Sequence, residues 1–240
     1  MIRTAIVAVS LTIFTLLAGP PLLLYTAITG NPDLLFRIGV GGVYYISCAV
    51  GLRVKVVGRE KVPDGVCLFL ANHTSFADPV AIVWAIPRRV AILAKKSLFS
   101  IPVIGWAFRL AGFVPVDRSN RDAAIASVQR AAERMKQGTS FLAYPEGTRS
   151  YDGRLLPFKK GVFVMAIDAR ALIVPMGLAG AHKIAPKKSL RITPGEVVVR
   201  FGDPIDASQY TIEDRDALTQ RVRAALAALL PPDQRPLDLL

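Results

Sequence analysis

Residues 4 to 29 carry no charged side chain, and this stretch limits the possible folds more than any other part of the sequence. A helix that crosses a bilayer needs roughly 20 apolar residues, so the stretch is long enough. Gly19, Pro20 and Pro21 interrupt it, however, and a helix from about Thr4 to Ala18 is too short to cross comfortably. We therefore expect either a kinked span or a pair of helices that dip into one leaflet.

A second apolar stretch, from Leu34 to Leu52, follows at once and contains a single basic residue, Arg37. Arg37 can reach the headgroups while its stem stays in apolar surroundings. Glycines that would let two helices pack closely lie in the same stretch, at Gly39, Gly41 and Gly42. A cleaved signal peptide is the alternative, but a second apolar stretch disfavours it. Residues 1–52 are therefore predicted to be hydrophobic helices that anchor the chain to a membrane.

The formal net charge of the chain is +12, which favours a partner that carries phosphates. Beside an apolar N-terminal segment, an anionic membrane is a simpler partner than nucleic acid. The sequence has no recognisable helix-turn-helix or RNA-binding signature, so we expect no nucleic-acid partner. With only two cysteines and two histidines, widely spaced, we expect neither a disulfide framework nor a metal site.

From residue 53 onward, segments with strand and helix patterns alternate. Predicted strands are residues 53–57, 66–71, 90–94, 113–116, 141–144, 172–175 and 197–201. Predicted helices are residues 79–86, 98–110, 121–137 and 161–169, with a last one that a capping box at Thr211 and Asp214 opens. Such alternation predicts the α/β class for residues 53–230, with a mixed, largely parallel sheet covered by helices. Residues 231–240 are predicted to be a loose tail.

A histidine and an aspartate follow the second predicted strand, in the segment 72–79 (NHTSFADP). Residues five apart point about 140° away from each other on a helix, so His73 and Asp78 can pair only if residues 73–77 form a loop. Pro79 favours a helix that starts there, with Asp78 as its cap. Asp78 would then hold one imidazole nitrogen and leave the other free to take a proton. Taken singly, Asp78 is better explained as a helix cap, and His73 equally well as a structural histidine.

A neighbouring hydroxyl or thiol is an alternative nucleophile beside such a histidine, and Ser75 and Cys67 are the candidates. Neither has special flanking sequence, so we favour direct attack by a substrate hydroxyl. His182, the other histidine, lies in a basic loop and is expected to be solvated.

A second polar segment, residues 144–150 (YPEGTRS), also follows a predicted strand. In α/β sheets, sites gather where strands end, so the two segments are expected to meet. Glu146 supplies a carboxylate, Gly147 allows close backbone approach, and Arg149 offers a planar fork that matches phosphate. An ordinary polar turn with a surface arginine is the alternative.

Together, Asn-His-x-x-x-x-Asp and, about seventy residues later, Pro-Glu-Gly-Thr-Arg-Ser resemble the glycerolipid acyltransferases, particularly the 1-acyl-sn-glycerol-3-phosphate acyltransferases. Residues 112–118 (GFVPVDR) are similar to the family's middle motif, and residues 173–176 (IVPM) to its last one. Four motifs in the correct order, within roughly residues 50 to 205, make the resemblance specific.

The resemblance implies that His73 deprotonates an acceptor hydroxyl, which attacks the thioester of acyl-CoA or acyl carrier protein, and that Asp78 orients His73. It implies binding of the acceptor's glycerol-phosphate end by Lys95, Lys96, Arg118, Glu146, Gly147, Thr148 and Arg149. A backbone amide near Gly147 is, by analogy, the expected oxyanion donor. No cofactor or metal is implied, because the thiolate leaves readily.

The implied product is phosphatidic acid, formed from a lysophospholipid for phospholipid biosynthesis. The implied location is the cytoplasmic face of a membrane, the inner one if the source is bacterial. Another lysolipid, such as an acyl-amino-acid lipid, is an alternative acceptor, and a non-catalytic protein that binds anionic lipid is an alternative function. Four apolar residues are expected to shape an acyl channel, a membrane-facing patch or plain core: Phe99, Ile101, Val103 and Trp106.

Overall fold

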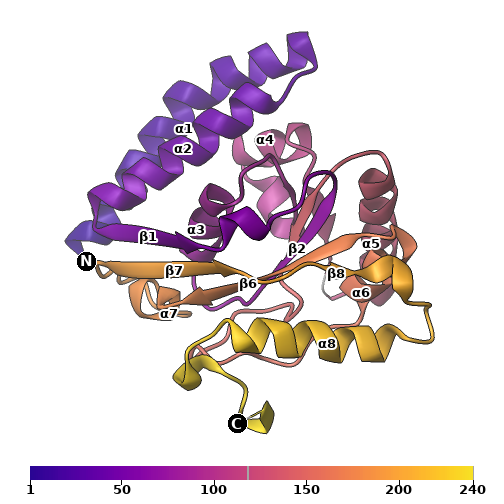
Figure 1. Cartoon of the computed structure of the whole chain (residues 1–240). Helices are drawn as coiled ribbons and strands as arrows, with labels where there is room; N and C mark the ends of the chain where they lie inside the picture. Colours follow the sequence, from indigo (N-terminus) through magenta and orange to yellow (C-terminus); the bar gives the residue numbers. More distant parts are fainter. Residues whose placement is uncertain (118, 240) are drawn as a thin grey trace.

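In the computed structural model, residues 1–117 and 119–239 are described (Figure 1). The strands are β1 (Leu52–Val57), β2 (Cys67–Ala71), β3 (Ala91–Lys95), β4 (Val114–Val116), β5 (Phe141–Ala143), β6 (Leu172–Ala179), β7 (Gly195–Phe201) and β8 (Ile205–Asp206). The helices are α1 (Ile2–Thr29), α2 (Asp33–Ala49), α3 (Asp78–Ala85), α4 (Ile104–Leu110), α5 (Arg121–Lys136), α6 (Gly161–Asp168), α7 (Ala181–Ile184) and α8 (Arg215–Ala228).

The strands form one sheet in the order β1-β7-β6-β2-β5-β3-β4, with β8 paired to β6. The pairs of β6 with β7 and with β8 are antiparallel, and the other pairs of the sheet are parallel. The predicted class, a mixed and largely parallel sheet covered by helices, is therefore confirmed. Because β6, β2, β5, β3 and β4 run in the same direction, their carboxyl ends lie along one edge of the sheet.

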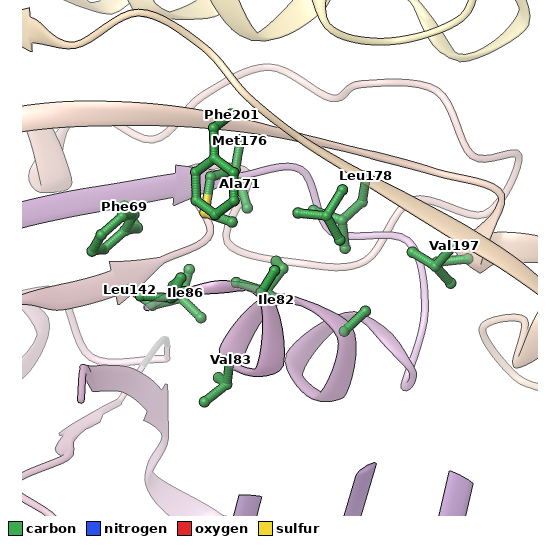
Figure 2. Packing of buried hydrophobic residues seen from close by; sticks show 14 of the residues in the cluster. Phe69, Ala71, Ile82, Val83, Ile86, Leu142, Met176, Leu178, Val197 and Phe201 are labelled. Atoms are coloured by element: carbon green, nitrogen blue, oxygen red, sulfur yellow. The ribbon is translucent and has the colours of Figure 1, made fainter. Parts of the chain in front are cut away.

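The central strand β2 is buried on both faces, as expected for a parallel strand between helical layers. Its side chains alternate, so that Phe69 joins the core beneath α3 while Leu68 joins the core beneath α5, α6 and α8. Figure 2 shows the first of these cores, where side chains of the sheet, among them Phe69 and Met176, lie on the side of the sheet that α3 covers with Ile82. The burial of β2 fixes where this strand ends. The segment with His73 and Asp78, residues 72–79, begins there and is called the first motif; residues 144–150 are the second motif.

The N-terminal segment is a helical hairpin in which α1 and α2 lie side by side (Figure 1). α1 runs through Pro20 and Pro21 without a break, so the predicted interruption is wrong. Packing outweighs the lost backbone hydrogen bonds, because Leu22 and Leu23 are buried against Leu35 of α2 and against α4. The opposite side of α1 exposes apolar side chains along its whole length, among them Ile6, Val9, Ile13, Leu17, Leu24 and Ile28.

Close contacts at two glycines pack the hairpin, one between its two helices and one against the body of the protein. The ring of Phe14 fills the position that a Cβ at Gly42 would occupy, which bears out the expected close helix packing at that glycine. The side chain of Val103 does the same at Gly19, where α1 meets the turn before α4. Between the hairpin and helices α3 and α4 lies an apolar cavity of about 370 Å³.

The predicted helix over residues 98–110 is broken in two. A 3₁₀ turn covers Lys96–Ser100, and α4 starts only at Ile104, because Pro102 cannot continue a helix and Val103 adopts a positive φ of 63°. Of the four apolar residues expected to shape an acyl channel, a membrane-facing patch or plain core, Val103 lines the apolar cavity, Phe99 is buried and Ile101 is 40% exposed. Trp106 is 64% exposed.

The C-terminal residues form two 3₁₀ turns, Pro232–Gln234 and Leu237–Leu239, and differ from the loose tail predicted from the sequence. Gln234 is buried and its side chain bonds the Gly180 amide at 3.0 Å and the Gly153 carbonyl at 3.3 Å. Arg223 of α8 holds Asp238 through two contacts of 2.7 Å. Polar side chains therefore hold this tail against the rest of the protein. The prediction of a loose tail rested on Pro231 and Pro232, which end the preceding helix but do not indicate these partners.

Candidate active site

The end of β2 brings His73 and Asp78 together. The Nδ1 atom of His73 lies 2.9 Å from Oδ2 of Asp78. The Asp78 side chain is fully buried, whereas that of His73 is 15% exposed. The described residues offer no partner to Nε2 of His73, so this nitrogen can meet a substrate. A carboxylate on Nδ1 selects the tautomer whose Nε2 accepts a proton.

The carboxylate of Asp78 also organises the loop that carries His73. Its Oδ2 accepts the backbone amides of Thr74 at 2.5 Å and of Ser75 at 2.8 Å. Asp78 is the first residue of α3 rather than the cap before it, so the predicted helix-cap role is replaced by this grip on the preceding loop. Asn72 ties the same loop to β6, because its side chain exchanges hydrogen bonds of 3.0 and 2.7 Å with the Leu178 backbone.

The second motif lies directly beside the first, since β5 pairs with β2. Glu146 Oε1 accepts the backbone amide of His73 at 2.6 Å, and the Ser150 amide donates to the His73 carbonyl at 2.8 Å. The other oxygen of Glu146 accepts the amide of Leu156 at 2.9 Å. Glu146 was predicted to bind substrate, but each of its two oxygens accepts a hydrogen bond from a backbone amide. Its side chain therefore holds the loop that carries His73 in place.

Glu146 is 2% exposed, and burial raises the pKa of its carboxyl to about 8. The amides of His73 and Leu156 oppose this change, because they favour the charged form, and nearby Asp78 adds to it. The carboxyl group is therefore poised to change charge near neutral pH inside the fold.

Tyr144, which precedes the motif's proline, stacks on the imidazole of His73. The ring centroids lie 4.0 Å apart with an interplanar angle of 18°. The Tyr144 hydroxyl is buried, and no described residue bonds it. Sequence reasoning assigned no role to this residue, although its place beside the second motif marks it as a neighbour of the site.

Arg149 of the second motif lies on an aromatic side chain of the first motif. Its guanidinium carbon lies 3.6 Å from the ring centroid of Phe76, and that ring is 62% exposed. One terminal nitrogen, Nη1, is buried without a partner among the described residues. Partial burial lowers the pKa of Arg149, yet the group stays charged. A planar, charged fork of this kind can bind an anion such as phosphate.

The other predicted substrate-binding residues have varied surroundings. Lys95 is the last residue of β3 and Lys96 follows it at the same sheet edge; both are exposed, and Lys96 pairs with Asp117 at 3.3 Å. Thr148 is exposed and accepts a hydrogen bond from Lys187. The amide of Gly147, the expected oxyanion donor, already donates to the Tyr144 carbonyl at 3.0 Å. Arg118 lies outside the described residues.

The candidates for a covalent nucleophile are placed unfavourably. Ser75 is buried, and its hydroxyl donates to the Ala185 carbonyl at 2.9 Å. Cys67 lies at the opposite end of β2 from His73, and burial raises the pKa of its thiol. His182 is half-buried on α7 against Gly153, so the prediction of a solvated histidine is wrong. The arrangement fits a histidine base that activates a hydroxyl of the substrate.

We expect replacements of Tyr144 to separate the stacked ring from its hydroxyl. Tyr144→Phe keeps the ring and removes a buried hydroxyl without a protein partner, so kcat should stay within about threefold and stability should rise by about 1 kcal/mol. Tyr144→Leu removes the stack, worth about 0.5–1.5 kcal/mol, and should lower kcat about tenfold. Steady-state kinetics and thermal unfolding test both. Equal losses in the two variants would show that the hydroxyl itself is used.

An imidazole–carboxylate pair near an arginine at a sheet edge defines a class of enzymes in which a histidine activates a hydroxyl. Within that class the chain belongs to the acyltransferase family, whose model matches residues 53–179.

Named relatives of the chain agree with this assignment. The 1-acyl-sn-glycerol-3-phosphate acyltransferase of Cocos nucifera is 38% identical over 71% of this chain and 56% of its own length. The enzyme of the same name from Limnanthes douglasii is 33% identical over 84% of this chain and 74% of its own. The crystal structure of the 1-acyl-sn-glycerophosphate (LPA) acyltransferase PlsC from Thermotoga maritima is similar with a TM-score of 0.80 and 25% identity, covering 95% of this chain and 93% of that one.

Proposed function

We propose that the chain transfers a fatty acyl group from a thioester to the sn-2 hydroxyl of 1-acyl-glycerol-3-phosphate and so produces phosphatidic acid. The observation that carries the proposal is the His73–Asp78 pair, whose 2.9 Å contact leaves Nε2 open beside Arg149. The names of the relatives support the same reaction and acceptor.

The chemistry requires one base and a leaving group. Nε2 of His73 takes the proton of the acceptor hydroxyl, and the oxygen attacks the thioester carbonyl to form a tetrahedral intermediate. When the intermediate collapses, the C–S bond breaks, and the proton on Nε2 passes to the departing thiolate. Asp78 keeps its charge throughout and stabilises the imidazolium that forms in between. Because the thiolate leaves readily, the proposed reaction needs no metal.

Arg149 is the proposed partner of the acceptor's phosphate, since its planar charged fork matches phosphate and is held on Phe76 next to the His73 loop. Lys95 at the end of β3 and Lys96 directly after it are proposed as further phosphate partners. The acyl chain is proposed to enter the apolar cavity, which Pro79 and Val80 line directly after Asp78. Acyl-CoA and acyl carrier protein are both candidate donors.

The N-terminal apolar helix fits association with a membrane. By length and composition, α1 is the helix among the described residues that is long and apolar enough to cross one. Both of its ends contact the α/β body, through Thr4 at one end and Leu22 and Leu23 near the other. We propose that the hairpin lies in one leaflet, with the active site on the cytoplasmic face.

A panel of acceptors and donors tests the function. Purified protein in vesicles with 1-acyl-glycerol-3-phosphate and labelled acyl-CoA should give labelled phosphatidic acid, detected by mass spectrometry, and EDTA should not reduce the rate. Product from another lysolipid, such as an acyl-amino-acid lipid, and none from this acceptor would overturn the acceptor assignment. Binding to anionic vesicles without turnover of any acceptor would instead indicate a non-catalytic lipid-binding protein.

A further inference from the structure

The loop between α7 and β7, residues 185–194, lies against the first motif. The Ala185 carbonyl accepts the backbone amide of Phe76 at 3.4 Å and the hydroxyl of Ser75 at 2.9 Å. Pro186 and Ser75 add an isolated antiparallel bridge. The loop therefore fixes the backbone of Phe76, whose ring is the platform under Arg149.

The same loop grips the second motif through one side chain, Lys187. Its ammonium donates to the backbone carbonyl of Arg149 at 2.7 Å and to the hydroxyl of Thr148 at 3.2 Å. It also lies 3.8 Å from the ring centroid of Tyr151. A charged donor to a carbonyl is stronger than a neutral one, so this contact fixes the backbone of Arg149 firmly.

One short loop therefore holds both members of the Arg149–Phe76 pair, the ring through Ala185 and the arginine through Lys187. We propose that Lys187 is a positioning residue for the acceptor: it keeps the Arg149 guanidinium on the ring of Phe76, where the charged fork can meet the acceptor's phosphate. The inference rests on the proposed function, because it takes the anion that Arg149 binds to be the acceptor's phosphate. Because the arginine is already held in place, less side-chain conformational entropy is lost when the acceptor binds.

The part of the loop near residues 190–192 is fixed by helix α1. The hydroxyl of Thr4, in the first turn of α1, donates to the Leu190 carbonyl at 2.5 Å and accepts the Ile192 amide at 3.2 Å. These two bonds join the N-terminal end of the hairpin to the loop that carries Lys187. The position of Arg149 therefore depends on how α1 sits against the body of the protein.

Lys187→Met tests the proposal against Lys188→Met, which removes the same charge one residue away without touching Arg149. Lys187→Met should raise the KM for the lysolipid about tenfold, as expected for loss of a charged hydrogen bond, while kcat falls less than about threefold. The KM for the donor and the pH profile of kcat should not change, and Lys187→Arg should recover part of the loss. Equal KM values for the two methionine variants would overturn the proposal.

Thr4→Val extends the test to helix α1, with Thr12→Val in the same helix as its control. The Thr12 hydroxyl bonds only within α1, to the Ala8 carbonyl at 2.8 Å. Thr4→Val should raise the same acceptor KM, by about threefold, and Thr12→Val should not. An unchanged KM in Thr4→Val would overturn the link to α1.

Arg149→Ala separates this inference from the proposed function. A large rise in acceptor KM in Arg149→Ala together with a normal KM in Lys187→Met would leave the function intact and refute the positioning role. A normal KM in Arg149→Ala would refute the phosphate assignment itself.

Discussion

His73→Ala is expected to lower kcat about a thousandfold, the largest change in activity that we predict. A positioned general base contributes roughly 10²- to 10⁴-fold, and no other described group near the open Nε2 can take its place. The KM for the acceptor should change little, because Arg149 and its platform stay in place. Steady-state kinetics with 1-acyl-glycerol-3-phosphate and acyl-CoA measure both constants.

His182→Ala is the matched control, since His182 is the other histidine of the chain and lies outside the pair. We expect it to keep most of the wild-type kcat. Imidazole added to His73→Ala should restore part of the rate, because the lost ring leaves a space beside Tyr144 and above Asp78. A His73→Ala variant that keeps more than about a tenth of the wild-type kcat would contradict the proposed mechanism.

The pairing of His73 with Asp78, and the position of both motifs at one sheet edge, were predictable because they follow from local rules. Residues five apart cannot share a helix face, and Pro79 marks a helix start, so a turning loop was the one geometry that joins His73 to Asp78. The alternation of strands and helices likewise predicts a largely parallel sheet, and parallel strands end at one edge. These steps need no knowledge of which strands are neighbours.

The direction in which each side chain points was not predictable in the same way. Glu146 was expected to face substrate, but it faces the backbone of His73 and Leu156. That outcome depends on β5 lying next to β2, a fact that the sequence alone does not contain. Lys187 had no local signal either, because its partners at Thr148 and Arg149 come from a distant segment.

The N-terminal helix shows how tertiary packing outweighs local preference. Pro20 and Pro21 would end an isolated helix, yet α1 continues through them because it packs against α2 and α4. Conversely, Pro102 does break the predicted helix over residues 98–110. The difference lies in the neighbours of each proline, which only the fold reveals.

The stability of the protein is expected to fall as the pH rises from about 5 to about 8.5, because of Glu146. Its carboxyl has a pKa of about 8 in the fold, against an ordinary value of 4.5, so the folded state holds a proton that the unfolded chain has released. The stabilisation is therefore complete below pH 4.5 and is lost as the pH rises through 8. A change of this size corresponds to roughly 3–5 kcal/mol. Urea denaturation in a nonionic detergent at several pH values measures it.

Glu146→Gln should abolish most of this pH dependence, because an amide does not titrate. The comparison between wild type and variant is needed since burial lowers the pKa of His182, which adds stability as the pH rises through about 6.5. Both proteins keep His182, so its contribution cancels in the difference. The variant should also be less stable at pH 6, because its amide nitrogen meets the backbone N–H of either His73 or Leu156 and cannot accept it. A difference between the two proteins that stays constant from pH 5 to 8.5 would mean that Glu146 is already ionised at pH 5 and that the two amides outweigh its burial.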